Sequence, residues 1–182
     1  MLDRTKRIGK FLSLILRHQP ETIGLCVDEA GWASVDQLLD ACNRAGHSLT
    51  RADIEHVVAT NDKKRFSFSE DGAYIRANQG HSIQVDLGYE PREPPSILYH
   101  GTARRSLASI QKGGLLRGRR HHVHLSVDGL TAVRVGSRHG KPVVLQIRSG
   151  QMHLDGYVFY LSKNGVWLTD HVPPSYVFME ET

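Results

Sequence analysis

Residues 65–76, Arg-Phe-Ser-Phe-Ser-Glu-Asp-Gly-Ala-Tyr-Ile-Arg, form a pattern of two short strands joined by a turn. Apolar and polar side chains alternate in the first half, which places Phe66 and Phe68 on one face of a strand and Arg65 on the other. Asp71-Gly72 is a dipeptide that favours a tight turn between strands. The stretch therefore predicts a β-hairpin that presents Arg65 on its polar side.

Three helical patterns precede this hairpin. Apolar residues recur at helical spacing over about residues 4–17, which predicts the first helix. A capping box over residues 34–37 opens a second helix that ends near Gly46, and Thr50 caps a third. Three short helices followed by a hairpin are typical of a winged helix, which we expect over residues 1–77.

Beyond the hairpin, residues 78–95 contain glycine and proline without any periodic pattern, so we expect a linker there. Short apolar strands and two helices then alternate over residues 96–182, which predicts a second, mixed domain. The chain is therefore expected to have an α+β fold in two lobes. In this second domain the predicted strands lie near 97–99, 123–125, 143–147, 158–161 and 166–168, and the predicted helices at about 103–112 and 127–137.

The composition describes a globular chain of 182 residues, because 40% hydrophobic and only 23% charged residues exclude a disordered polymer. Its apolar stretches are far shorter than the roughly 20 residues that cross a bilayer. We expect a cytoplasmic monomer with no membrane partner. Cys26 and Cys42 are two cysteines without CxxC spacing, and we expect both to be reduced packing residues.

The net charge of +4 conceals an uneven distribution of charge. Residues 1–77 carry eleven Lys/Arg and eleven Asp/Glu, whereas residues 100–148 carry ten Lys/Arg, five His and the single acid Asp128. Like charges gathered in one segment repel each other unless an anion compensates them. The segment favours a polyanionic ligand, and a solvated basic surface is the alternative.

Two cationic groups lie at the ends of elements in the first lobe. Arg17-His18 stand where the first helix ends, so they either meet a ligand at a domain edge or complement the helix dipole. Arg65 follows Lys63-Lys64, a cluster suited to a nucleic-acid backbone or to plain solvation. Both groups are candidate anion-binding sites.

The segment 119–126, Arg-Arg-His-His-Val-His-Leu-Ser, is the densest chemical signal in the chain. In a strand, Arg120, His122 and His124 would share one face. A His-x-His pair can bind zinc or iron, but acids are scarce here and the arginines would repel a divalent cation. Phosphate is the better partner, because a guanidinium matches it with two hydrogen bonds.

The tripeptide at 100–102, His-Gly-Thr, follows a predicted strand. Its glycine would allow a ligand to approach the backbone closely. The alternative is a buried histidine with a purely structural role. Alone, the tripeptide does not distinguish the two interpretations.

Six separated blocks lie in order along nearly the whole chain: Phe11–Pro20, Lys63–Phe66, Tyr99–Thr102, Arg120–Ser126, Gly136–Gly140 and Asn164–Leu168. Taken together, they closely resemble the KptA-type RNA 2′-phosphotransferases. The resemblance implies an N-terminal winged helix and a C-terminal ADP-ribosyltransferase-like lobe, with RNA and NAD⁺ meeting between them.

The resemblance also implies a reaction and its residues. An internal RNA 2′-phosphate, as in spliced tRNA, would be transferred to NAD⁺ through an ADP-ribosylated 2′-phosphate, without a metal. The products would be RNA with a 2′-hydroxyl, nicotinamide and ADP-ribose 1″,2″-cyclic phosphate. The implied catalytic residues are Arg17, His18, Arg65 and Arg120, and the implied NAD⁺-binding residues are His100, Gly101, Thr102, His124, Ser126, Arg138 and Val166.

Val166 occupies a position where many relatives with this fold carry glutamate. A phosphate dianion is already a nucleophile, so it needs no carboxylate to activate it. Two alternatives stay open. The chain could be an ADP-ribosyltransferase that stops after the first step, for instance by capping a terminal RNA or DNA phosphate. It could also be a winged-helix regulator that binds NAD⁺ without catalysis.

Overall fold

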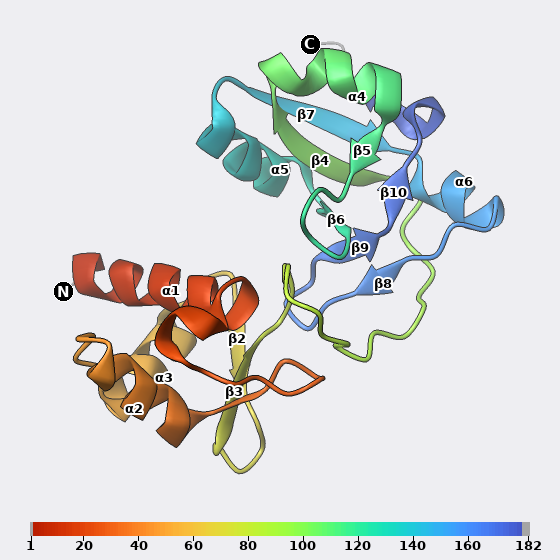
Figure 1. Ribbon diagram of the computed structural model, residues 1–182. Coiled ribbons are helices and arrows are strands. Elements are labelled where there is room, and N and C mark those ends of the chain that lie inside the picture. Colours follow the sequence, from red (N-terminus) through yellow and green to blue (C-terminus); the bar gives the residue numbers. More distant parts are fainter. Residues whose placement is uncertain (1, 180–182) are drawn as a thin grey trace. The chain divides into compact units, whose positions relative to one another are not determined.

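The structure is a computed structural model that describes residues 2–179. The chain divides into two compact units, Met1–Gly88 and Tyr89–Thr182. Both combine helices with small antiparallel sheets (Figure 1). The fold is therefore mixed α and β, as the sequence predicts.

Over residues 2–88, the first unit contains three α-helices and one three-stranded sheet, and it confirms the predicted helices and hairpin. Antiparallel strands follow in the order β1-β3-β2, so the hairpin β2-β3 gains a third strand that the sequence analysis missed. The elements are α1 (Leu2–Arg17), the 3₁₀ helix η1 (Pro20–Ile23), β1 (Ala33–Ser34), α2 (Val35–Arg44), α3 (Arg51–Thr60), β2 (Phe66–Phe68) and β3 (Tyr74–Ala77).

Between residues 89 and 179, the second unit holds three small sheets, and every strand pair within them is antiparallel. Their strand orders are β11-β7-β4, β6-β9-β8 and β10-β5. The strands are β4 (Leu98–Ala103), β5 (Leu115–Leu116), β6 (Val123–Leu125), β7 (Pro142–Ile147), β8 (Tyr160–Leu161), β9 (Trp167–Thr169), β10 (His171–Val172) and β11 (Val177–Met179). The α-helices are α4 (Leu107–Gly113), α5 (Gly129–Gly136) and α6 (Ser149–Leu154).

Two of the predicted helices begin later than expected. Residues 104–106 form a 3₁₀ turn before α4, and Asp128 caps α5 by accepting a hydrogen bond from the Thr131 N–H at 2.7 Å. Helix α6 and the strands β5, β10 and β11 were not predicted at all.

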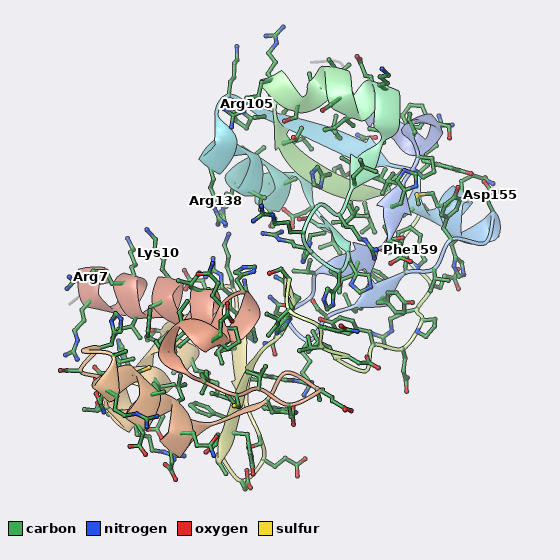
Figure 2. All side chains as sticks on the ribbon, in the orientation of Figure 1. Arg7, Lys10, Arg105, Arg138, Asp155 and Phe159 are labelled. Atoms are coloured by element: carbon green, nitrogen blue, oxygen red, sulfur yellow. The ribbon has the colours of Figure 1, made fainter. Side chains whose placement is uncertain are left out.

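Each unit has its own hydrophobic core. In the first, the inner faces of α1, α2 and α3 pack against the sheet, and Leu16, Ile54 and Ile75 are fully buried. In the second, Phe159 is fully buried among strand residues (Figure 2). Cys42 lies in the first core as expected, whereas Cys26 is exposed, so its expected packing role is wrong.

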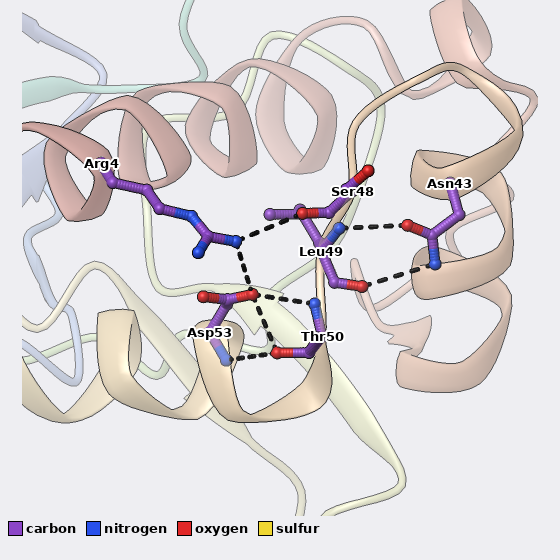
Figure 3. A network of polar contacts seen from close by, with 6 residues as sticks. All are labelled: Arg4, Asn43, Ser48, Leu49, Thr50 and Asp53. Atoms are coloured by element: carbon purple, nitrogen blue, oxygen red, sulfur yellow. Dashed lines mark hydrogen bonds and ion pairs between the residues drawn. The ribbon is translucent and has the colours of Figure 1, made fainter.

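The start of α3 is fixed by a capping box that also anchors α1. The Asp53 N–H donates to the Thr50 hydroxyl at 3.2 Å, and the Thr50 N–H donates to the Asp53 carboxylate at 3.0 Å (Figure 3). Arg4 of α1 reaches the same carboxylate at 3.0 Å. These hydrogen bonds, led by those from Thr50, hold the pKa of Asp53 below its usual value. Arg4 is thereby turned toward α3 (Figure 3).

Helix α5 lies directly against β4, and two glycines allow this approach (Figure 1). A Cβ atom at Gly101 in β4 would overlap the carbonyl oxygen of Ala132 in α5. A Cβ atom at Gly136 would lie 2.8 Å from the Thr102 carbonyl oxygen. The space beside Gly101 is thus filled by a helix, which gives a different reason for this glycine from the close ligand approach expected from the sequence.

Within residues 2–179, no helix is both long enough and apolar enough to span a membrane.

Candidate active site

The candidate residues fall into two groups, one in each compact unit. Arg17, His18 and Arg65 belong to the first unit, and the remaining candidates belong to the second. The two groups are described in turn.

Arg17 is the last residue of α1, and the chain that follows the hairpin is hydrogen-bonded to it. Its carbonyl oxygen accepts from the N–H groups of Ser82 and Ile83, at 2.9 and 3.3 Å. The next side chain, His18, places Nδ1 2.8 Å from the Ser82 hydroxyl. Arg17 is only 9% exposed, which is unusual for an arginine. The end of α1 is therefore held in place by hydrogen bonds to residues 82 and 83, and the side chain of Arg17 is buried there.

Arg65 immediately precedes β2, close to this helix end. The Arg17 guanidinium carbon lies 5.9 Å from the ring centroid of Phe66, the residue after Arg65. Arg65 itself donates from Nη1 to the Asn61 side-chain oxygen at 3.3 Å, and its carbonyl oxygen accepts from the Asn78 N–H at 2.8 Å. The end of α1 and the start of β2 thus bring two candidate arginines into one region of the first unit.

In the second unit, Arg120 and His124 are in contact. Nη1 of Arg120 lies 3.5 Å from Nδ1 of His124, the middle residue of β6. The strand begins only at Val123, so the expectation that residues 120, 122 and 124 share a strand face is wrong. The exposed Arg120 side chain nevertheless reaches His124 from the preceding turn.

His100 of β4 contacts the same strand. Its Nδ1 lies 3.0 Å from the carbonyl oxygen of His124. A carbonyl oxygen only accepts, so the proton of this hydrogen bond is on Nδ1 of His100. The two half-buried histidines and Arg120 are therefore linked through His124.

Ser126 and Val166 lie beside these histidines. Backbone hydrogen bonds of 2.8 Å in both directions join Ser126 to Tyr99, the neighbour of His100. The register of β6 and β9 pairs His124 with Leu168, and continuing it places Val166 opposite Ser126. The turn before Val166 is held by the buried Ser162, whose hydroxyl accepts from the Val166 N–H at 3.0 Å. The strands β4, β6 and β9 thus gather these candidates at one junction.

Thr102 and Arg138 lie near α5. Thr102 is 8% exposed, and its backbone lies against Gly136 of α5. Arg138 lies in the 3₁₀ turn η3 (Ser137–His139) that follows α5, and its side chain is exposed (Figure 2).

The surroundings of His122 were not foreseen. Its ring centroid is 5.3 Å from that of Tyr160 and 6.1 Å from that of Tyr89, and its Nε2 is 3.8 Å from the Asp170 carboxylate. Burial lowers the pKa of His122, and the Asp170 carboxylate only partly opposes this. No local pattern could have revealed these partners, because they come from distant parts of the sequence.

In the described part of the chain, no three His, Cys, Asp or Glu side chains are grouped so that they could hold a metal ion such as zinc or iron. The basic segment is exposed instead. All ten of its lysines and arginines, residues 104 to 148, are exposed to solvent. Among the residues that the structure describes, only Arg117 of these ten approaches a carboxylate, that of Asp170 at 4.0 Å. Such a surface is suited to an anion.

Comparison with known proteins agrees with this chemistry. Residues 3–171 match the model of the family described as RNA 2′-phosphotransferase, Tpt1/KptA family. The chain is 56% identical over 176 residues to a protein of Acaryochloris marina, covering 97% of both chains. It is 58% identical over 169 residues to one of Agrobacterium fabrum, covering 93% of this chain and 91% of the other. It is 55% identical over 172 residues to one of Flavobacterium johnsoniae, covering 94% of both.

Each of these three relatives is named "Probable RNA 2'-phosphotransferase". A family match over nearly the whole length and identities above one half leave one assignment. The chain belongs to the Tpt1/KptA family of RNA 2′-phosphotransferases, and it is accordingly a transferase.

Proposed function

We propose that this enzyme removes an internal 2′-phosphate from RNA, as in spliced tRNA, by transferring it to NAD⁺. The products are RNA with a free 2′-hydroxyl, nicotinamide and ADP-ribose 1″,2″-cyclic phosphate. The observation that carries the proposal is the convergence of His100 and Arg120 on His124, at 3.0 and 3.5 Å. The neutral histidine His100, which would bind a sugar, and the cation Arg120, which would bind a phosphate, would thereby lie close together. The proposed lobes are a winged helix over 1–77, a linker over 78–95 and an ADP-ribosyltransferase-like lobe over 96–182.

The side chains at the junction of β4, β6 and β9 are chemically suited to bind a dinucleotide co-substrate. Nδ1 of His100 carries a proton, so Nε2 is an acceptor when that ring is neutral, which suits a ribose hydroxyl. Ser126 adds a hydroxyl, and Val166 adds an apolar side chain where a carboxylate would repel phosphate. In the proposal, His100, Gly101, Thr102, His124, Ser126, Arg138 and Val166 hold NAD⁺, which supplies the ribose carbon that the RNA phosphate attacks.

The first step needs little help from the protein at the nucleophile. The RNA 2′-phosphate is an anion at neutral pH, and it attacks the ribose carbon as nicotinamide leaves with the bonding electron pair. The result is RNA whose 2′-phosphate carries ADP-ribose. Val166 is consistent with this step, because no general base is required there.

The second step is transfer at phosphorus, where cations matter most. The ribose 2″-hydroxyl attacks the phosphorus, and the RNA 2′-oxygen leaves and takes a proton. Arg17, Arg65 and Arg120 would hold the charge on the phosphate oxygens, and His18 would transfer the proton near neutral pH. The low exposure of Arg17 supports a role with an anion, since a guanidinium interacts more strongly in a site from which water is excluded.

The test is incubation of the purified protein with a 2′-phosphorylated oligonucleotide and NAD⁺. Dephosphorylated RNA together with the cyclic phosphate supports the proposal. A lasting ADP-ribosylated product would instead indicate an ADP-ribosyltransferase for nucleic-acid phosphates, which a terminally phosphorylated oligonucleotide would then confirm. No consumption of NAD⁺ would indicate a nucleic-acid regulator. Either of the last two results overturns the proposal.

A further inference from the structure

The first lobe has no net charge, but its positive and negative residues are unevenly distributed between the first helix and the rest of the lobe. Residues 1–17 contain five Lys/Arg and one acid, so their net charge is +4. Residues 18–77 contain six Lys/Arg and ten acids, so their net charge is −4. The positive side of this lobe is therefore α1.

Helix geometry places three of these cations in one row. Lys6, Lys10 and Arg17 are separated by four and seven residues, so at 3.6 residues per turn they lie within about 40° of one another. The opposite face of α1 carries Ile8 and Ile15, which are buried in the core. Lys6 and Lys10 are exposed, and Lys10 projects from α1 on the side away from α2 and α3 (Figure 2).

This row is not explained by the stability of the helix. Lys6 and Lys10 stand four residues apart, and like charges at that spacing slightly destabilise a helix. In the part of the chain that the structure describes, neither lysine is within ion-pair distance of a carboxylate. Arg4 differs, because its partner is Asp53. Lys6 and Lys10 therefore gain most from an anion outside the described part of the chain.

We propose that Lys6 and Lys10 bind backbone phosphates of the RNA that flank the 2′-phosphate, so that α1 guides the strand toward Arg17. Arg7, exposed beside the row, extends it. The inference rests on the proposed function, which assigns the 2′-phosphate to Arg17. The rise of 1.5 Å per residue separates Lys10 from Arg17 by about 10 Å along the axis, and Lys6 by about 16 Å. Several phosphates of one strand can meet such a row.

Lysines suit this task because they are point charges on flexible stems. They neutralise phosphates without reading bases, so they raise affinity for any sequence. A longer RNA should therefore be a better substrate than a 2′-phosphorylated dinucleotide, which has too few phosphates to reach both lysines. The row determines a preference for length rather than for sequence.

The experiment compares Lys10→Glu and Lys6→Ala/Lys10→Ala with wild type on two substrates, a 2′-phosphorylated dinucleotide and a long 2′-phosphorylated oligonucleotide. The ratio of kcat/KM for the long to the short substrate should fall several-fold in both variants. For the long substrate, the logarithm of the binding constant falls linearly with the logarithm of the salt concentration. The slope of this line should become shallower by roughly 0.7 for each phosphate contact that is lost. Substrates extended only on the 5′ side or only on the 3′ side of the 2′-phosphate show which of these two flanking segments binds α1.

Arg44→Glu is the matched control, because Arg44 is an exposed cation in the last turn of α2. It changes the net charge as Lys10→Glu does. An equal loss in Arg44→Glu, or an unchanged ratio in the α1 variants, overturns the inference. If wild type fails to release 2′-phosphate from either substrate, the proposed function fails. Binding of a fluorescent 2′-phosphorylated oligonucleotide then still tests the row, because the same salt dependence is expected.

Discussion

Nδ1 of His100 donates a hydrogen bond to the carbonyl oxygen of His124 over 3.0 Å, while Nδ1 of His124 faces Nη1 of Arg120 at 3.5 Å. A guanidinium only donates, so Nδ1 of His124 acts as an acceptor and carries no proton in this contact. The two histidines are therefore set in opposite tautomers, with the proton on Nδ1 of His100 and on Nε2 of a neutral His124. In the proposed function, this leaves Nε2 of His100 as an acceptor for NAD⁺ when that ring is neutral.

The first prediction separates the two nitrogens of His100. An asparagine amide nitrogen can take the place of Nδ1 but cannot reach the position of Nε2. His100→Asn should therefore keep a melting temperature near that of wild type and lose affinity for NAD⁺. His100→Leu should lose the hydrogen bond as well, at a cost of about 1 kcal/mol in the free energy of unfolding. Thermal unfolding with and without NAD⁺ measures both. Unchanged NAD⁺ affinity in His100→Asn would remove His100 from the proposed site.

A second prediction concerns the contact between β4 and α5. Gly101→Ala should destabilise the second unit severely, because the new Cβ atom would overlap the Ala132 carbonyl oxygen in the backbone of α5. The loss should exceed about 3 kcal/mol, since backbone cannot move aside as a side chain can. Gly113→Ala is the control, because its added Cβ would meet no described atom within 4 Å apart from its chain neighbours and the backbone of its own helix. Denaturant unfolding of both variants should differ sharply, and equal stabilities would contradict the packing.

Local patterns predicted the elements that they encode completely. The hairpin around Asp71-Gly72 was foreseen from alternation and turn residues alone, and the short strand at 123–125 was predicted as well. Strands β5 and β10 have two residues each and exist only because they pair with each other across more than fifty residues. A short segment without its own period gives no signal before its partner is known.

The same limit applied to the candidate site. The end of α1 was located correctly, but its attachment to Ser82 depends on a segment that the sequence marked only as linker. Gly101 was recognised as exceptional, but its close packing against α5 could not be read from any local pattern. The contact of Arg120 with His124 was expected through a strand face and instead arises from a turn. Residue types thus indicated the chemistry, whereas the geometry depended on tertiary packing.

A third prediction follows from the lowered pKa of His122. Burial holds this pKa below the ordinary histidine value of about 6.5, so between the two values the unfolded chain binds more protons than the folded one. The free energy of unfolding therefore rises with pH through that window, and stability is lost as the pH falls below about 6.5. His122→Phe keeps a ring against Tyr160 but cannot titrate.

Melting temperatures of both proteins, measured from about pH 7.5 to about pH 5.5, test this. The wild type should lose more stability on acidification than His122→Phe. Parallel curves would show that another group dominates the acid response.

The last prediction concerns the order of the two chemical steps. In the proposed function, Arg65 and Arg120 act chiefly on the phosphate during transfer at phosphorus, whereas expulsion of nicotinamide depends on the seating of NAD⁺. Removing one donor from a transition state typically costs about 3–4 kcal/mol, or on the order of a hundred- to a thousand-fold in rate. Applied to the second step alone, this loss makes the second step slower than the first.

Arg65→Ala and Arg120→Ala should therefore accumulate RNA that carries ADP-ribose on its 2′-phosphate, visible as a slower-migrating species on a denaturing gel. Arg119→Ala is the matched control for Arg120→Ala, because Arg119 is the preceding exposed arginine, whereas Nη1 of Arg120 lies 3.5 Å from Nδ1 of His124. It should show no such accumulation. Since nicotinamide release reports the first step and free RNA the second, their ratio decides the outcome. An equal loss of both products in the Arg65 and Arg120 variants, or wild-type release of dephosphorylated RNA, would exclude these two arginines from the second step.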